Sequence, residues 1–190
     1  VNALVPVEKD KQKFTKLQTT QIQIWKRFLT SGKFDVEDDD QAEEIIDALI
    51  DWIDENDEER DHGAESGYYL SRSPSYEVRN APVTYPEELL LIRGMTKELF
   101  YGNEEYSALR DYLTVAGREG KININSAPVE LLMALNEELS EETGQELEEF
   151  RRSEDNKDIL VNPDWYKQVN SSLNFTADLI TVQSRYFKVS

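Results

Sequence analysis

Cysteine is absent from this sequence of 190 residues, and histidine occurs only at position 62. The lack of cysteine excludes disulfide bonds, thiolate metal sites and cysteine nucleophiles. A single histidine also leaves zinc without the imidazole and thiolate ligands that it needs. We therefore expect His62 to be an exposed loop residue that binds no metal.

Familiar catalytic motifs are also missing. The sequence has no G-x-S-x-G elbow, no phosphate-binding glycine loop and no H-E-x-x-H pair. A serine–histidine–carboxylate triad would have to use His62, and no serine is marked out as its partner. With 39 Asp and Glu residues, a carboxylate pair at glycosidase spacing carries no information. These absences predict a protein that is not an enzyme.

Long hydrophobic runs do not occur. No stretch is apolar for long enough to cross a bilayer, and no signal-peptide pattern opens the chain. Because the first residue is valine, we expect a segment of a longer protein whose targeting information lies outside this sequence. The lack of cysteine is compatible with a periplasmic or an intracellular location.

Positive charge is scarce. Lys and Arg number 21 against 39 Asp and Glu, a net charge of −18. Such a surface repels phosphate backbones and anionic lipid head groups, so nucleic acid and membrane surfaces are poor partners and divalent cations are good ones. A hydrophobic fraction of 38% is still enough to build a core.

Two amphipathic helices are predicted near the start of the chain. Residues 14–33 carry apolar side chains near helical spacing, and Gly32 is the signal that stops this helix. Residues 35–57 begin with carboxylates, which complement the dipole at a helix start. The apolar positions of this second helix are Ala42, Ile45, Ile46, Leu49, Ile50 and Ile53. We expect a helical hairpin.

The remaining chain mixes extended and helical patterns. An extended connector with three prolines precedes a helical stretch, residues 85–117, that is broken at Gly94 and Gly102. Ile122 and Ile124 then alternate as in a strand, and Ser126 is predicted to cap a helix with Pro128 in its first turn. The tail reads as a strand. We expect a mainly α fold with these divisions: strand stub 1–7, first helical unit 8–120, second helical unit 121–175 and strand stub 176–190.

The acidic segment, residues 51–70, reads "DWIDENDEERDHGAESGYYL". Counting from Asp54, alternate positions fall on Asn56 and Glu58, and the twelfth falls on Glu65, as in an EF-hand calcium loop. Glu59 stands where that loop has glycine, and no clear helix follows, so the ligand spacing matches but the motif does not. Gly63 and Gly67 would supply the tight turns.

Two interpretations of the acidic segment are open. Charge runs are usually solvated loops. Here Trp52 and Ile53 precede the carboxylates and Tyr68, Tyr69 and Leu70 follow them, so both ends of the loop would be anchored. Anchored carboxylates repel one another, and Arg60 supplies one compensating charge. This argument favours a bound calcium ion.

A helix-hairpin-helix module is a further alternative. The stretch "ININSAPVELLMAL" is similar to the opening of such modules, which bind DNA backbones. Their hairpin needs glycine so that backbone amides can reach a phosphate. In this chain glutamates occupy "NEELSEETG", where that hairpin would lie, and they would repel phosphate. We expect shared helical architecture without DNA binding.

Five blocks, taken in order, resemble the general secretion pathway protein K family, the large minor pseudopilins of bacterial type II secretion. They are "NALV", "ALIDWIDENDEERDHGAESGYYL", "RNAPVTYPEELLLIRGMTKELF", "ININSAPVELLMAL" and "LITVQSRYFKV". The resemblance spans nearly the whole chain. Residues 136–175 are longer and more acidic than the compact family pattern.

The resemblance implies a SAM-like, helical-hairpin domain inserted into a pilin-like sheet, with strand stubs at both ends. It implies a non-enzymatic periplasmic component of an inner-membrane protein, joined to the membrane by an N-terminal helix absent from this sequence. The implied partners are other minor pseudopilins at the tip of the pseudopilus, where they initiate or cap the filament, and secreted substrate proteins are further candidates. Calcium is the implied ligand, and its site would use Asp54, Asn56, Glu58 and Glu65, with Asp51, Asp57 and Asp61 in reserve. The alternative is a stand-alone extracellular calcium-binding interaction module.

Overall fold

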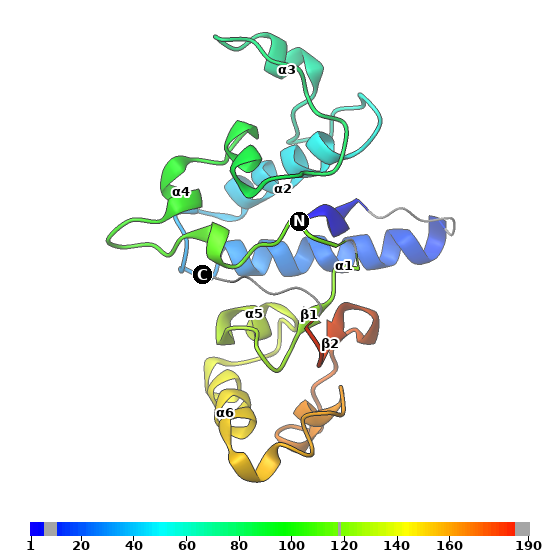
Figure 1. Cartoon of the computed structure of the whole chain (residues 1–190), viewed down its shortest axis with the longest axis vertical. Coiled ribbons are helices and arrows are strands. Elements are labelled where there is room, and N and C mark those ends of the chain that lie inside the picture. The colour runs from blue at the N-terminus through cyan, green and yellow to red at the C-terminus, as the bar shows by residue number, and fades with distance from the viewer. Residues whose placement is uncertain (6–10, 118, 185–190) are drawn as a thin grey trace. The chain divides into compact units, whose positions relative to one another are not determined.

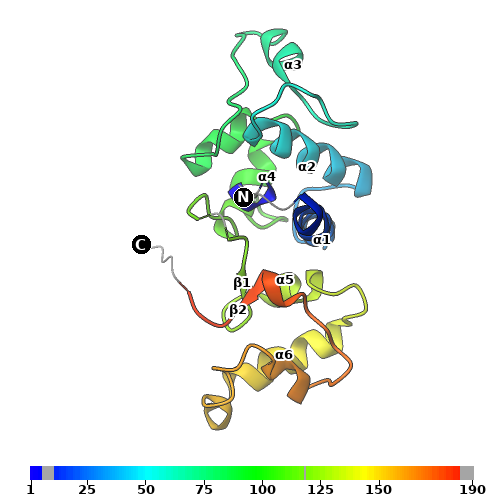
Figure 2. The same cartoon turned by 90° about the vertical axis from the view of Figure 1, so that its right-hand side faces the viewer.

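The computed structural model describes residues 1–5, 11–117 and 119–184. The chain divides into two compact units, residues 1–118 and 119–190. Helices dominate both units, and the described sheet has two short strands (Figures 1 and 2). The predicted mainly α fold with short strands is confirmed. No helix in the described ranges is long and apolar enough to span a membrane.

The first unit is built on a helical hairpin of α1 (Lys11–Leu29) and α2 (Asp39–Ile53). The predicted apolar stripe of α2 is buried along its whole length. Asp38 caps α2 by accepting a hydrogen bond from the Gln41 amide at 2.9 Å. Lys26 of α1 forms salt bridges with Asp39 and Glu43 of α2, so charge and apolar burial both hold the pair together.

Short helices make up the rest of the helical structure described in the first unit. They are α3 (Ser66–Leu70), α4 (Lys97–Tyr101) and the 3₁₀ helices η1 (Asn2–Leu4), η2 (Pro86–Leu91) and η3 (Leu109–Asp111). Gly94 and Gly102, where the sequence predicts breaks, both have positive φ, at 81° and 71°. A side chain at Gly94 would also lie 2.9 Å from Ile45 of α2. The glycine therefore lets this turn approach the hairpin closely.

The predicted strand stub at residues 1–7 is wrong in its described part. Residues 2–4 form the 3₁₀ helix η1, and residues 6 and 7 lie outside the described ranges. The reason is the buried side chain of Asn2, which donates to the Val83 and Val115 carbonyls and accepts from the Val83 amide. The side-chain amide thus takes the place of the backbone in a strand-like pairing.

The second unit contains the parallel pair β1 (Ile122–Asn123) and β2 (Ile180–Thr181) with helices α5 (Val129–Ala134) and α6 (Glu141–Arg152). Its other helices are η4 (Glu154–Asn156), η5 (Trp165–Gln168) and η6 (Ala177–Leu179). Trp165 is buried, stacks on Phe150 and donates to Asn125 at 2.7 Å.

Two predictions in this unit need correction. Pro128, not Ser126, occupies the N-cap position of α5, because the amides of Ser126 and Ala127 bond to the Asn123 carbonyl in a preceding turn. The strand predicted over residues 176–190 is limited to Ile180–Thr181 among the described residues, since residues 177–179 form η6. Residues 185–190 lie outside the described ranges.

Replacing Gly94 by alanine is expected to destabilise the first unit. The left-handed backbone costs about 1–2 kcal/mol for a residue with a Cβ, and the contact with Ile45 adds to this. Gly67 is the matched control, because it lies inside α3 with no atom near its would-be Cβ, so Gly67→Ala should stabilise by about 0.5–1 kcal/mol. Urea denaturation of both variants measures these changes. Equal effects at the two positions would contradict the assignment.

Candidate metal centre in the acidic loop

The acidic loop, residues 54–65, connects α2 to α3 and is anchored by Asp51 in the last turn of α2. Asp51 is fully buried, and its Oδ2 accepts hydrogen bonds from the backbone amides of Arg60 at 3.2 Å and Ala64 at 2.9 Å. A Cβ on Gly63 would lie 1.8 Å from the same oxygen. The loop can fold back onto Asp51 only because position 63 is glycine.

The early part of the acidic loop is ordered by its own side chains. Asp54 Oδ1 accepts from the amide and side chain of Asn56, and Asn56 Oδ1 accepts from the Glu58 amide at 2.7 Å. Asp57 Oδ1 accepts from the hydroxyl of Ser66 at 2.6 Å, which joins the loop to α3. These bonds fix local turns in a segment that is otherwise exposed.

Glu65 closes the acidic loop at the N-cap of α3, and the residue is only 3% exposed. Neither carboxylate oxygen of Glu65 meets a hydrogen-bond donor in the described chain, and the same holds for Oδ1 of Asp51. Glu65 shares a side-chain hydrogen bond with Asp57, to which it donates when it is protonated. A buried carboxylate without a donor is costly, and its charged form is disfavoured. Burial and the nearby charges of Asp51, Asp54 and Asp57 raise the pKa of Glu65 to about 8.

Burial also raises the pKa of Asp51 to about 6, despite its two backbone donors. The pKa of Asp54 is raised by burial as well. The structure therefore brings four of the predicted ligand residues near one another, and the unpaired oxygens of two of them, Asp51 and Glu65, are buried. The four residues are Asp51, Asp54, Asp57 and Glu65.

The other predicted ligand residues lie at the surface. Asn56, Glu58 and Asp61 are exposed, and the amide oxygen of Asn56 is engaged by the Glu58 backbone. As the side chains stand, the described residues contain no group of three or more Asp, Glu or His side chains that could hold a metal ion. The assignment of these seven residues to a cation site thus stays a prediction.

The aromatic side chains at both ends of the acidic loop pack together. The ring of Trp52 lies 5.0 Å from that of Tyr69, and Tyr69 lies 5.1 Å from Tyr68 and 5.3 Å from Tyr76. Trp52 also donates to Glu88 at 2.9 Å. Loop ends held in this way cannot splay apart to relieve repulsion between carboxylates.

Positive charge near the acidic loop is directed to α2. Arg60 pairs with Asp47 at 2.7 Å. Its charge also lowers the pKa values of Asp51 and Asp54, but burial outweighs this effect and both pKa values stay raised. His62 has an exposed side chain 3.9 Å from Glu43. Arg93, which sequence reasoning did not single out, donates to the Gly63 carbonyl at 2.9 Å and lies near Glu44. Its only sequence signal is its place in the block "LIRGM".

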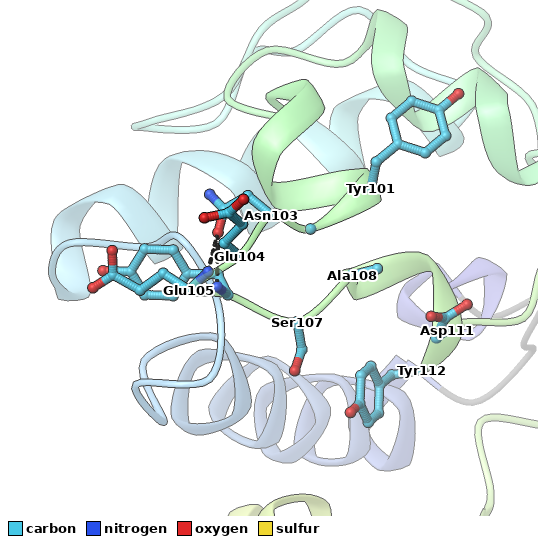
Figure 3. Close-up of a pocket in the computed structure, with 10 residues that line it drawn as sticks. Tyr101, Asn103, Glu104, Glu105, Ser107, Ala108, Asp111 and Tyr112 are labelled. Carbon is cyan, nitrogen blue, oxygen red and sulfur yellow. Dashed lines mark hydrogen bonds between the residues drawn. The ribbon is translucent and has the colours of Figure 1, made fainter.

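A second feature, a hollow of about 480 Å³ between α4 and η3, contains none of the predicted ligand residues (Figure 3). Asn103 shapes its rim by accepting from the amides of Glu105 and Tyr106, both at 2.8 Å. Glu104 and Glu105 are exposed there, and no lining residue in the described chain has a buried polar atom without a partner. The acidic loop is therefore the stronger candidate.

Comparisons with known proteins define the class of this chain as a component of bacterial protein secretion. Residues 1–118 match the family described as type II secretion system (T2SS), protein K. The chain therefore belongs to the type II secretion system protein K family, whose members are minor pseudopilins.

The comparisons also give one related sequence and one similar fold. A putative type II secretion system protein K of Escherichia coli K12 is 34% identical over 59 residues, which is 31% of this chain and 18% of that protein. The fold is similar to a chain in the crystal structure of the GspK-GspI-GspJ complex from the type 2 secretion system of enterotoxigenic Escherichia coli. The TM-score is 0.59 at 21% identity, over 96% of this chain and 61% of that chain. This chain thus covers less than two thirds of either relative.

The raised pKa values predict how stability depends on pH without metal. Between pH 4.5 and about 8, folded Glu65 keeps a proton that the unfolded chain has released, so the free energy of unfolding falls as the pH rises. Asp51 has the same sign between pH 3.8 and about 6. In EDTA, urea denaturation should show lower stability at pH 8 than at pH 5.

The matched variants isolate the contribution of Glu65. Glu65→Gln should reduce the difference in the free energy of unfolding between pH 5 and pH 8. Glu55→Gln, at an exposed loop position, should leave that difference unchanged. If both variants keep the wild-type pH dependence, Glu65 is not the group responsible.

Proposed function

We propose that this chain is part of a minor pseudopilin that assembles with other minor pseudopilins at the tip of the type II secretion pseudopilus. There it would initiate or cap the filament and so support protein export. The family match over residues 1–118 carries this proposal. The structural neighbour supports it, because that protein belongs to a complex of GspK, GspI and GspJ. In this role the domain is a non-enzymatic, periplasmic part of an inner-membrane protein.

We further propose that the acidic loop binds calcium. The supporting observation is the pair of buried carboxylates, Glu65 and Asp51, whose free oxygens have no donor among the described residues. Calcium takes six to eight oxygen ligands in flexible geometry and supplies the positive charge that these carboxylates lack. The set of carboxylates and carbonyl oxygens in this loop suits such a hard cation and offers no ligand that zinc prefers.

The remaining ligands would come from the exposed side of the loop. Asp54 and Asp57 lie close enough to Glu65 to raise its pKa, and each has one oxygen engaged by local donors. Binding would require these side chains to turn toward Glu65, which agrees with the lack of a ready-made cluster in the described residues. Asn56, Glu58 and Asp61 would complete the coordination from the surface.

Calcium should raise the thermal stability of the chain, and chelation should reverse the effect. A ligand that binds only the folded state stabilises it by about 2.7 kcal/mol at 100 times its dissociation constant. That corresponds to a rise of roughly 5–10 °C in melting temperature for a domain of this size. Magnesium should substitute poorly because it demands stricter geometry.

Two variants test where the ion binds. Glu65→Gln should abolish most of the calcium-dependent rise, while Glu59→Gln, at an exposed position outside the proposed ligand set, should retain it. A wild-type melting temperature that does not respond to calcium would refute the cation site and leave the assembly role untouched.

Assembly is tested with the full-length protein, co-expressed and purified with the other minor pseudopilins of the same organism. We expect a stable heteromeric complex that survives size-exclusion chromatography, with the affinity tag alone as the control. Lack of association in the presence of calcium would contradict the proposed role. Calcium binding without association would instead favour a stand-alone interaction module.

A further inference from the structure

Arg93 lies in the turn between η2 and α4, far from the acidic loop in sequence. The turn is held in place because Gly94 packs closely on Ile45 of α2 and the Met95 amide bonds to the Ile92 carbonyl at 3.1 Å. The backbone amide of Arg93 also donates to the Tyr69 hydroxyl at 3.4 Å. The base of the Arg93 side chain is therefore fixed against both α2 and α3.

The guanidinium of Arg93 joins three parts of the first unit. One nitrogen donates to the Gly63 carbonyl at 2.9 Å, and another lies 3.4 Å from Glu44 of α2. The guanidinium carbon also lies 5.4 Å from the centre of the Tyr68 ring in α3. The side chain is 31% exposed, so these contacts are partly shielded from water.

The backbone around Gly63 is hydrogen-bonded by two side chains from outside the acidic loop. Asp51 holds the amides of Arg60 and Ala64 from the inside, and Arg93 holds the carbonyl of Gly63 between them. Glu65 follows two residues later, and both of its carboxylate oxygens are buried without a hydrogen-bond donor in the described chain. A loop released at Gly63 would lose the constraint that keeps Glu65 buried beside Asp51.

We propose that Arg93 is a positioning residue for the cation site: it fixes the loop backbone so that Glu65 and Asp51 present their free oxygens to one ion. The inference rests on the proposed calcium site. For the loss of Arg93, a positioning role and simple electrostatics predict opposite changes in calcium affinity. Removing a positive charge close to an acidic site should strengthen cation binding through the charge alone, whereas removing a positioning contact should weaken it.

The test is calcium titration of the chain by isothermal calorimetry after removal of metal with EDTA. Arg93→Gln should bind calcium at least about tenfold more weakly than the wild type, the range seen when residues that orient metal ligands are lost. Arg72→Gln is the matched control, because Arg72 lies over the same Tyr68 ring at 5.4 Å but donates no hydrogen bond to the acidic loop in the described chain. Its affinity should be unchanged or slightly higher.

Arg93→Lys keeps the charge but cannot present a planar fork to Gly63 and Glu44 together, so it should bind severalfold more weakly. This variant also serves if Arg93→Gln fails to fold. Wild-type or tighter affinity in either Arg93 variant would overturn the inference. Absence of calcium binding by the wild type would instead refute the site itself, so the two failures are distinguishable.

Thermal melting separates positioning from a general structural role. A residue that only stabilises the fold should lower the melting temperature equally with and without calcium. A positioning residue should also shrink the calcium-induced rise, and Arg72→Gln should leave that rise intact. An undiminished rise in Arg93→Lys would contradict the proposal.

Discussion

The acidic loop depends on one buried interaction, the acceptance of two backbone amides by the carboxylate of Asp51. Burying a carboxylate is unfavourable, and the two donors offset only part of the cost, since burial still raises the pKa of Asp51. The contact requires glycine at position 63 and draws the end of the loop into the first unit. Glu65 is buried as a consequence, although its carboxylate meets no hydrogen-bond donor there within the described chain.

The charges around this anchor are the argument for the proposed cation over another side chain. Arg60, which lies in the loop, and Arg93, which bonds to it, are already paired with carboxylates of α2: Arg60 with Asp47 and Arg93 with Glu44. Neither guanidinium reaches the unpaired oxygens of Glu65. A divalent ion brings two charges without the side-chain entropy of a lysine or arginine. In the proposed state, carboxylates that otherwise repel one another and loosen the loop are held together by binding the same ion.

The parts of the fold that could be predicted are those determined by local patterns. The apolar spacing and acidic start of residues 39–53 lead directly to the buried stripe of α2, and the glycines at 94 and 102 occupy backbone conformations that disfavour other residues. Errors arose where distant partners decide. Asn2 replaces a strand pairing through bonds to residues 81 and 113 positions away, which no local pattern reveals. The cap of α5 is a local error instead, because the Asn123 carbonyl holds the amides of Ser126 and Ala127 in the turn before the helix.

The acidic loop shows the same limit at finer scale. The ligand spacing of an EF-hand loop indicates Glu65, but it treats all the acidic residues of the loop as equivalent ligands. In the structure they are not equivalent, because Asp51 and Glu65 are buried whereas Glu58 and Asp61 are exposed. Depth is a tertiary property, set by the aromatic cluster and by a hydrogen bond to Arg93 that spans 30 residues. A sequence can therefore indicate which segment is electrostatically crowded, whereas the fold decides which carboxylates cannot relieve the crowding by turning to water. That distinction, more than the number of acidic residues, is what makes a loop suited to a cation.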